Sequence, residues 1–183
     1  MAVDTPFMSV KRPDKPQVLL LIYGAGGHKT EMKRLLAYLH SASSSSPNSE
    51  TIPNHLPDFV SLGAGPLPGG LAHFEADDLR SKTSRLHSVL FFLPTLVKIL
   101  CHTLILSRRY KVLGVLSTGP SLCIIPMVLF RLAGVKTVFL ETFCRFQTRS
   151  VTGRIMANIA HRFLIQNIQL QSLYPKAEYC GRL

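Results

Sequence analysis

Five short apolar runs alternate with segments of helical periodicity along this chain, and this alternation limits the possible folds more than any other feature. The runs are QVLLLIY, DFVSLGA, KVLGVLS, KTVFLE and RFLIQN. Between them, residues 29–40 and 121–132 carry apolar side chains at helical spacing. Strands that are apolar on both sides and are joined through helices form a parallel sheet covered on both faces. The sequence therefore predicts an α/β fold with a Rossmann-like, doubly wound, mostly parallel sheet.

Residues 16–183 are expected to form one domain, because a single core can serve a chain of 183 residues. Residues 1–15 are predicted to be a polar tail without the apolar segment of a signal peptide, which favours the cytosolic side of a membrane. The stretch SASSSSPNSE is expected to be a surface loop. The stretch GAGPLPGG and the charged residues that follow, up to Arg85, are expected to be irregular.

Residues 86–107, LHSVLFFLPTLVKILCHTLILS, form an apolar segment long enough to cross a bilayer as a helix. A proline, a lysine and a histidine interrupt it, and the basic RRYK follows. On a helix, one polar stripe contains Ser88, Thr95, Lys98 and His102, which suits a helix at a membrane surface better than a span. A span would also separate strands of one sheet. We therefore expect a membrane-surface helix, with burial in the fold or against a partner as the alternative.

The formal net charge is +11, and basic residues occur along most of the chain. Such a charge favours an anionic partner: a phosphate ligand, an acidic membrane surface or nucleic acid. Nucleic acid is the weakest of the three, since the sequence has no zinc-ligand spacing, no aromatic-basic RNA motif and no recognition helix. The four cysteines are widely spaced without a CxxC pair, so we expect reduced, mostly buried thiols and no metal site.

The loop YGAGGHKTEM joins the first predicted strand to the first predicted helix. Glycines allow unusual backbone angles and the close approach of a phosphate to the N–H groups at a helix start. The loop departs from the dinucleotide-binding pattern at Lys29 and from the P-loop pattern at His28. It is therefore either a phosphate cradle of another kind or a tight turn. The positive end of the helix dipole would keep His28 neutral, as a general base or hydrogen-bond donor, unless it only packs locally.

Two more groups follow apolar runs and should lie at the same edge of a parallel sheet, where ligands bind. Glu141 ends the fourth run, and the burial of a carboxylate is costly unless the group is paired or used. Arg145 is a natural partner for Glu141 or for a phosphate. Residues 118–120 form a turn after the third run, with Pro120 near a helix start. A structural Glu–Arg pair and an ordinary connection remain the alternatives at these two places.

Four segments together resemble the asparagine-linked-glycosylation-fourteen family: GAGGHKTEM, STGPSLCIIP, ETFCRFQTRSVTGRI and QSLYPKAEYCGRL. The resemblance covers most of the chain, residues 18–183. It implies the N-terminal half of a GT-B glycosyltransferase that works without a cofactor. The family is the acceptor-binding, membrane-recruiting subunit of a split UDP-N-acetylglucosamine transferase, which adds the second GlcNAc to GlcNAc-PP-dolichol. The implied partners are a thirteen-family chain that binds UDP-GlcNAc, a lipid diphosphate-sugar acceptor and a membrane surface.

The resemblance also implies roles for individual residues. Either His28 or Glu141 would take the proton from the acceptor hydroxyl. The family match implies that Gly26 and Gly27 lie near the acceptor diphosphate and that Arg145 corresponds to a family arginine. From their positions in the loops after the strands, Gly24, Lys29, Thr118 and Gly119 are expected to hold the diphosphate as well, together with Arg145. Independently of the family, the apolar segment 86–107 predicts that Leu90, Phe91, Phe92, Leu93 and Leu96 meet the membrane. The residues that match the partner-docking tail of the family are Gly181, Arg182 and Leu183.

The expected location is the cytosolic face of the endoplasmic reticulum membrane. Many eukaryotic members begin with a transmembrane anchor that this sequence lacks, so membrane attachment would fall to residues 86–107 or to partners. Two alternative functions remain open. One is an accessory subunit of a bacterial-type exopolysaccharide glycosyltransferase at the plasma membrane. The other is a purely scaffolding membrane tether whose glycine loop is vestigial.

Overall fold

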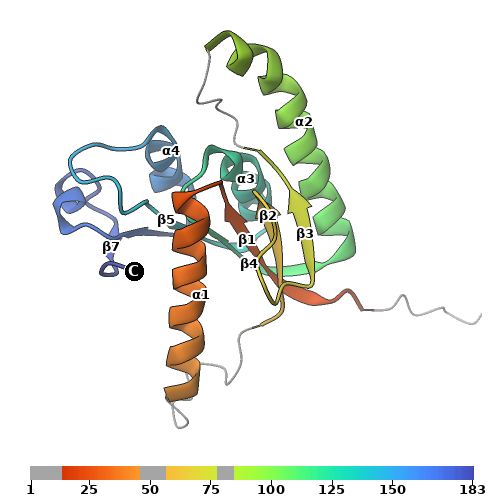
Figure 1. Ribbon diagram of the computed structural model, residues 1–183, viewed down its shortest axis with the longest axis horizontal. Coiled ribbons are helices and arrows are strands. Elements are labelled where there is room, and N and C mark those ends of the chain that lie inside the picture. The colour runs from red at the N-terminus through yellow and green to blue at the C-terminus, as the bar shows by residue number, and fades with distance from the viewer. Residues whose placement is uncertain (1–13, 46–56, 78–84) are drawn as a thin grey trace, which may run out of the picture.

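The computed structural model describes residues 14–45, 57–77 and 85–183, and does not describe the side chains of residues 42–45 and 85–92 (Figure 1). Within these ranges, seven parallel strands form one sheet in the order β3-β2-β1-β4-β5-β6-β7. The strands are β1 Gln17–Tyr23, β2 Phe59–Gly63, β3 Ala72–Glu75, β4 Lys111–Ser117, β5 Lys136–Leu140, β6 Arg162–Ile165 and β7 Glu178–Tyr179. The helices are α1 Gly27–Ser45, α2 Arg85–Arg109, α3 Ile124–Leu132 and α4 Val151–Ile159, with the short turns η1 Ser121–Cys123 and η2 Ile168–Ser172.

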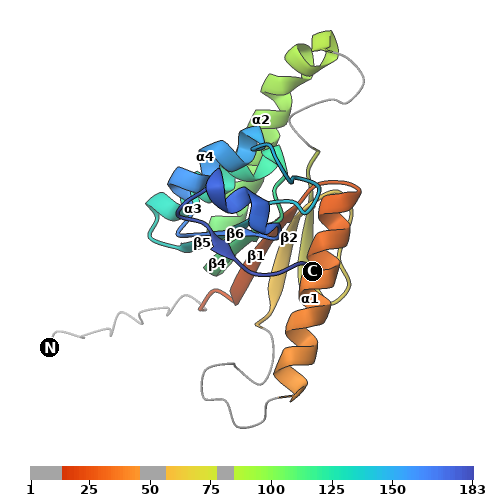
Figure 2. The same ribbon diagram turned by 90° about the vertical axis from the view of Figure 1, so that its left-hand side faces the viewer.

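The sheet is doubly wound, as predicted. From β1 the chain proceeds through α1 to β2 and β3 in one direction, and then returns through α2 to β4, β5 and β6 in the other. Right-handed crossovers place helices on opposite faces when the direction of winding reverses. Figure 2 shows this arrangement, with α1 on one face of the sheet and α2, α3 and α4 on the other.

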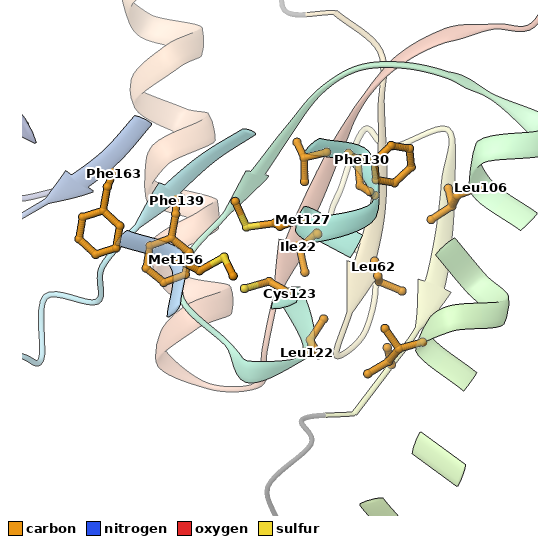
Figure 3. Close-up of a cluster of buried hydrophobic side chains, with 14 of the residues drawn as sticks. Ile22, Leu62, Leu106, Leu122, Cys123, Met127, Phe130, Phe139, Met156 and Phe163 are labelled. Carbon is orange, nitrogen blue, oxygen red and sulfur yellow. The ribbon is translucent and has the colours of Figure 1, made fainter. Parts of the chain in front are cut away.

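The larger core lies between the sheet and the three helices α2, α3 and α4. Figure 3 shows Ile22 close to Met127 of α3, Phe139 close to Met156 of α4, and Leu62 on the side of the cluster toward Leu106 of α2. The α1 face has a smaller core around Leu21, Tyr23 and Met32. Leu113, which lies at the register shift between β4 and β1, is 42% exposed.

All five predicted strands and both predicted helical segments are present, although residues 121–123 form a 3₁₀ turn before α3. The segment predicted to be irregular contains β3, which pairs with β2 at the edge of the sheet. The short elements β7 and α4 were not predicted. The serine-rich stretch begins inside α1 rather than as a loop, and residues 46–50 lie outside the described residues, as do residues 1–13 of the predicted tail.

The cysteines were predicted as reduced and mostly buried. All four are free of disulfide bonds, but Cys123 alone is buried. Cys101, Cys144 and Cys180 are exposed, so the prediction of mostly buried thiols is wrong. Cys101 shows the reason: apolar runs mark buried strands reliably, but α2 also carries apolar residues on its outer face.

Candidate functional site

The loops after β1 and β4 meet where the winding of the sheet reverses. These strands are neighbours, but β1 leads to α1 on one face and β4 leads to η1 and α3 on the other. Thr118 joins the two loops: its N–H donates to the Ile22 carbonyl (3.2 Å), and its hydroxyl donates to the His28 carbonyl (2.9 Å). In open α/β sheets, ligands bind in the crevice at such a reversal. The residues after both strands therefore form the candidate site.

The glycine loop leaves backbone accessible at the start of α1. The helix begins at Gly27, and Gly26 adopts a φ of +65°, a conformation that strains other residues. A Cβ added at Gly26 or Gly27 would meet no atom within 4 Å, so both adjoin open space, whereas Gly24 is buried. The N–H groups of a first helical turn have no acceptor within their helix. This loop can therefore approach an anion closely.

His28 is held at this opening in a defined tautomer. Its Nδ1 atom lies 2.5 Å from the Thr118 carbonyl oxygen. A carbonyl oxygen only accepts hydrogen bonds, so Nδ1 carries the hydrogen and the neutral ring has its lone pair at Nε2. Gly119 (φ +92°) lets the ring pack closely, because a Cβ added there would lie 3.4 Å from the ring Cε1 atom. In this tautomer the neutral ring can accept a proton at Nε2.

A buried carboxylate that the sequence analysis missed lies beside His28. Glu31 is 1% exposed, and its Oε2 atom lies 3.6 Å from His28 Nδ1. Its Oε1 atom accepts hydrogen bonds from the Phe143 N–H (2.8 Å) and the Thr142 hydroxyl (3.0 Å), which tie α1 to the connection between β5 and α4. The available signal was the i,i+3 spacing of His28 and Glu31, which places both on one side of a helix.

Glu141 is also 1% exposed, as its position after a buried strand suggested. Its Oε2 atom accepts hydrogen bonds from the Ser150 hydroxyl (3.0 Å) and the Tyr174 hydroxyl (3.1 Å). Burial raises the pKa of Glu141, and these two hydrogen bonds oppose the rise. The charge of Arg145 also lowers the pKa of Glu141, but its effect is the smallest of those that act on this group. The Arg145 guanidinium donates a hydrogen bond to the Thr148 hydroxyl instead. The carboxylate is therefore held against the start of α4 by hydroxyl groups rather than by the predicted arginine.

The structure brings part of the predicted diphosphate site together. Gly26, Gly27, Thr118 and Gly119 surround His28 from two loops. Two predicted cations are directed elsewhere. The Lys29 ammonium lies beside the connection between β2 and β3, where a Cβ added at Gly65 would be 2.9 Å from it. Arg145 is exposed and bonds Thr148.

Two buried amides after β6 also belong to this edge of the sheet. Gln166 is 2% exposed, and its Nε2 atom donates to Glu31 Oε1 (3.3 Å) and to the Glu141 carbonyl (3.2 Å). The Asn167 amide donates to the Phe143 carbonyl (2.7 Å). Both residues were predicted to end the strand RFLIQN. Their place after a strand, at the ligand-binding edge, was the signal that could have identified them.

Helix α2 contains the predicted segment 86–107. Among the described residues, no helix combines the length and the mean hydropathy that crossing a bilayer requires. Part of the polar stripe faces the fold, since the His102 ring packs edge-on against Phe74 with centroids 5.5 Å apart. The outward side carries an exposed apolar ridge formed by Leu93, Val97, Leu100 and Leu104.

The five predicted membrane residues all lie on α2. Leu93 is 64% exposed, and Leu96 is half-buried. The side chains of Leu90, Phe91 and Phe92 lie outside the described residues. The exposed ridge therefore overlaps the predicted surface at Leu93 and extends beyond it toward the end of the helix.

The fold and the site define a class of protein: a doubly wound parallel α/β unit with an accessible glycine loop and an oriented histidine at the reversal of its sheet. Residues 80–183, more than half of the chain, match the family described as "Oligosaccharide biosynthesis protein Alg14 like". The chain belongs to this family, which confirms the resemblance found in the sequence.

Relatives that share one name with each other span most of the chain. The human "UDP-N-acetylglucosamine transferase subunit ALG14" is 28% identical over 93% of this chain and 85% of its own length. The mouse protein of that name is 27% identical over 90% of this chain and 82% of its own length. Among solved structures, Phytolacca americana UGT2 complexed with UDP-2fluoro-glucose and pterostilbene matches 88% of this chain and 49% of its own, with a TM-score of 0.41 and 9% identity.

Proposed function

We propose that this chain is the acceptor-binding subunit of a heteromeric N-acetylglucosaminyltransferase that uses UDP-GlcNAc. Family membership and the names of the human and mouse relatives support a transferase subunit. The observation that carries the acceptor role is His28, oriented by Thr118 beside a glycine loop that is open to an anion. The net charge of +11 suits a lipid diphosphate-sugar, for which we propose GlcNAc-PP-dolichol. The partner would be a UDP-GlcNAc-binding chain that completes a GT-B cleft.

In this proposal the acceptor diphosphate lies against the backbone at Gly26 and Gly27. His28 Nε2 takes the proton of the acceptor 4-hydroxyl as the hydroxyl oxygen bonds the anomeric carbon of the donor sugar. The bond from that carbon to UDP breaks, UDP leaves with the electron pair, and the configuration at the carbon inverts. We assign the proton to His28 rather than to Glu141, because the Glu141 carboxylate is buried and accepts bonds from Ser150 and Tyr174.

Reconstitution tests the split arrangement. The chain is purified alone and together with a co-expressed UDP-GlcNAc-binding partner, and transfer from UDP-GlcNAc to a lipid-diphosphate GlcNAc is measured. We expect transfer by the pair and none by the chain alone. Transfer by the chain alone at the full rate would contradict the proposal. Transfer by the pair from another UDP-hexose, but not from UDP-GlcNAc, would favour the exopolysaccharide alternative.

We also propose that the ridge on α2 rests on the cytosolic face of the endoplasmic reticulum membrane. Its four leucine and valine residues recur at spacings of three and four, which places them in one stripe along the helix. Arg108 and Arg109 are exposed at the end of the same helix, where they can meet anionic headgroups. An apolar stripe with basic residues at its end is typical of helices that lie in a membrane interface.

Placing charges on this ridge should weaken membrane binding. In the double variant Val97→Asp and Leu104→Asp, we expect the fraction that floats with phosphatidylserine-containing vesicles to fall more than about tenfold. Each lost apolar contact is worth roughly 1.5–3 kcal/mol when fully buried. The matched control is Leu132→Asp, which changes an 81% exposed leucine on α3 and should leave flotation unchanged. Equal flotation of all three proteins would exclude the ridge as the membrane contact.

A further inference from the structure

The last residues of the chain lie against the candidate site. Figures 1 and 2 both show the C-terminus beside α1. The Leu183 N–H donates to Gln166 Oε1 (3.2 Å). The Arg182 guanidinium lies 5.5 Å from the ring centre of Phe143 and 5.9 Å from that of Phe146, within the range of cation–π attraction. Both terminal residues therefore contact groups that surround Glu31.

Gln166 connects the tail to Glu31, and its contacts determine the orientation of its amide. The oxygen accepts from the Leu183 N–H, and the nitrogen donates to the Glu31 carboxylate and the Glu141 carbonyl. The flipped amide would set its NH₂ against an N–H and its oxygen against a carboxylate, which is unfavourable on both sides. Because Gln166 is 2% exposed, water cannot readily replace these partners.

Arg182 is also connected to the Glu31 carboxylate, indirectly through Phe143. Its guanidinium contacts the Phe143 ring, and the Phe143 N–H donates to Glu31 Oε1. The same oxygen thus receives a bond from Gln166 on one side and from Phe143 on the other. The second carboxylate oxygen, Oε2, accepts no hydrogen bond from the described residues and lies 3.6 Å from His28 Nδ1.

We infer that Glu31 and Gln166 are positioning residues for His28, and that Arg182 and Leu183 belong to the same network. As a carboxylate, Glu31 would stabilise the imidazolium that forms when His28 accepts a proton. Gln166 holds that carboxylate in place. Because the same amide also bonds Leu183, a movement of the tail would shift the Gln166 amide and with it the carboxylate. Displacement of the tail, for example by a partner chain that binds it, would therefore change the environment of His28. This inference rests on the proposed function only for the role of His28 as the base.

The main test is Gln166→Met, which keeps the volume but removes both ends of the amide. In the isolated chain, we expect the ring ¹⁵N NMR signals of His28 to shift. In the reconstituted complex, we expect kcat to fall about tenfold while KM for UDP-GlcNAc and the affinity for the partner stay the same, since only proton transfer is affected. The matched control is Gln171→Met, because the Gln171 Nε2 atom donates to the backbone carbonyls of Tyr174, Pro175 and Ala177.

A second variant covers the case in which Gln166→Met does not fold. Deletion of Leu183 removes the N–H group that donates a hydrogen bond to Gln166 Oε1, and it changes no buried side chain. The ring ¹⁵N signals of His28 should shift in the same direction as in Gln166→Met. Unchanged His28 signals and unchanged kcat in a folded variant would overturn the inference. The NMR arm needs no catalysis, so it can fail or succeed independently of the proposed transferase function.

Discussion

Replacing His28 with alanine is expected to lower kcat of the reconstituted complex about 10²- to 10⁴-fold, the usual contribution of a general base. The ring is oriented by the Thr118 carbonyl so that Nε2 can take the acceptor proton, and alanine removes that lone pair. KM for UDP-GlcNAc should change little, because we place the donor on the partner chain. The measurement is steady-state transfer with the purified pair.

The matched control for this experiment is His40→Ala. His40 is an exposed histidine on the same helix, twelve positions further on, or about 18 Å at the helical rise. It should leave kcat unchanged. Co-purification of the partner with the His28 variant must be checked first, so that a lost complex is not mistaken for lost chemistry. An intact His28→Ala complex with full activity would remove His28 as the base. If Glu141→Ala were fully active as well, the scaffolding alternative would be favoured.

Gly153→Ala is expected to destabilise the fold by about 3 kcal/mol or more, although alanine normally favours a helix by roughly 1 kcal/mol. A Cβ at this position would lie 1.9 Å from Glu141 Oε2, 2.6 Å from the Tyr174 hydroxyl and 2.7 Å from the Ser150 hydroxyl. Both hydroxyls donate hydrogen bonds to Glu141 Oε2, so relief of the clash would break hydrogen bonds to a buried carboxylate. For a domain of this size, the melting temperature should fall by about 6–12 °C.

The control for this clash is Gly114→Ala in β4. A Cβ there would lie 3.4 Å from the flexible end of Leu19, which is an ordinary contact, so we expect a change of less than about 1 kcal/mol. Thermal unfolding followed by circular dichroism measures both variants. A Gly153→Ala protein as stable as the unmodified chain would mean that Glu141 does not pack against the start of α4.

The centre of the sheet could be predicted because its strands are buried and therefore apolar. QVLLLIY and KVLGVLS, for example, became β1 and β4. The edge strands could not be predicted in this way. β3 and β7 each have one strand neighbour, and β7 has only two residues, both exposed. Ala72 and Phe74 of β3 do pack against the larger core, but the four residues of β3 are too few to form an apolar run that the sequence would reveal.

Helix α4 was missed because Gly153 interrupts a nine-residue segment. A glycine is needed at this position because the Glu141 carboxylate occupies the space that a Cβ would fill. The sequence around Gly153 gives no sign of this contact. The site shows the same limit. His28 and the glycines follow a predicted strand and could be found. The hydrogen bond between Gln166 and Glu31 joins residues 135 positions apart, so only the folded chain reveals it.

The bond between Leu183 and Gln166 affects how the protein should be handled in the laboratory. An affinity tag or fluorescent protein fused directly after Leu183 would extend from a residue that lies beside α1 (Figures 1 and 2) and bonds the buried Gln166 amide. Activity measured with such a fusion would underestimate that of the unmodified chain. Strand β1 begins at Gln17, at the amino ends of the parallel strands, whereas His28 follows the carboxyl end of β1.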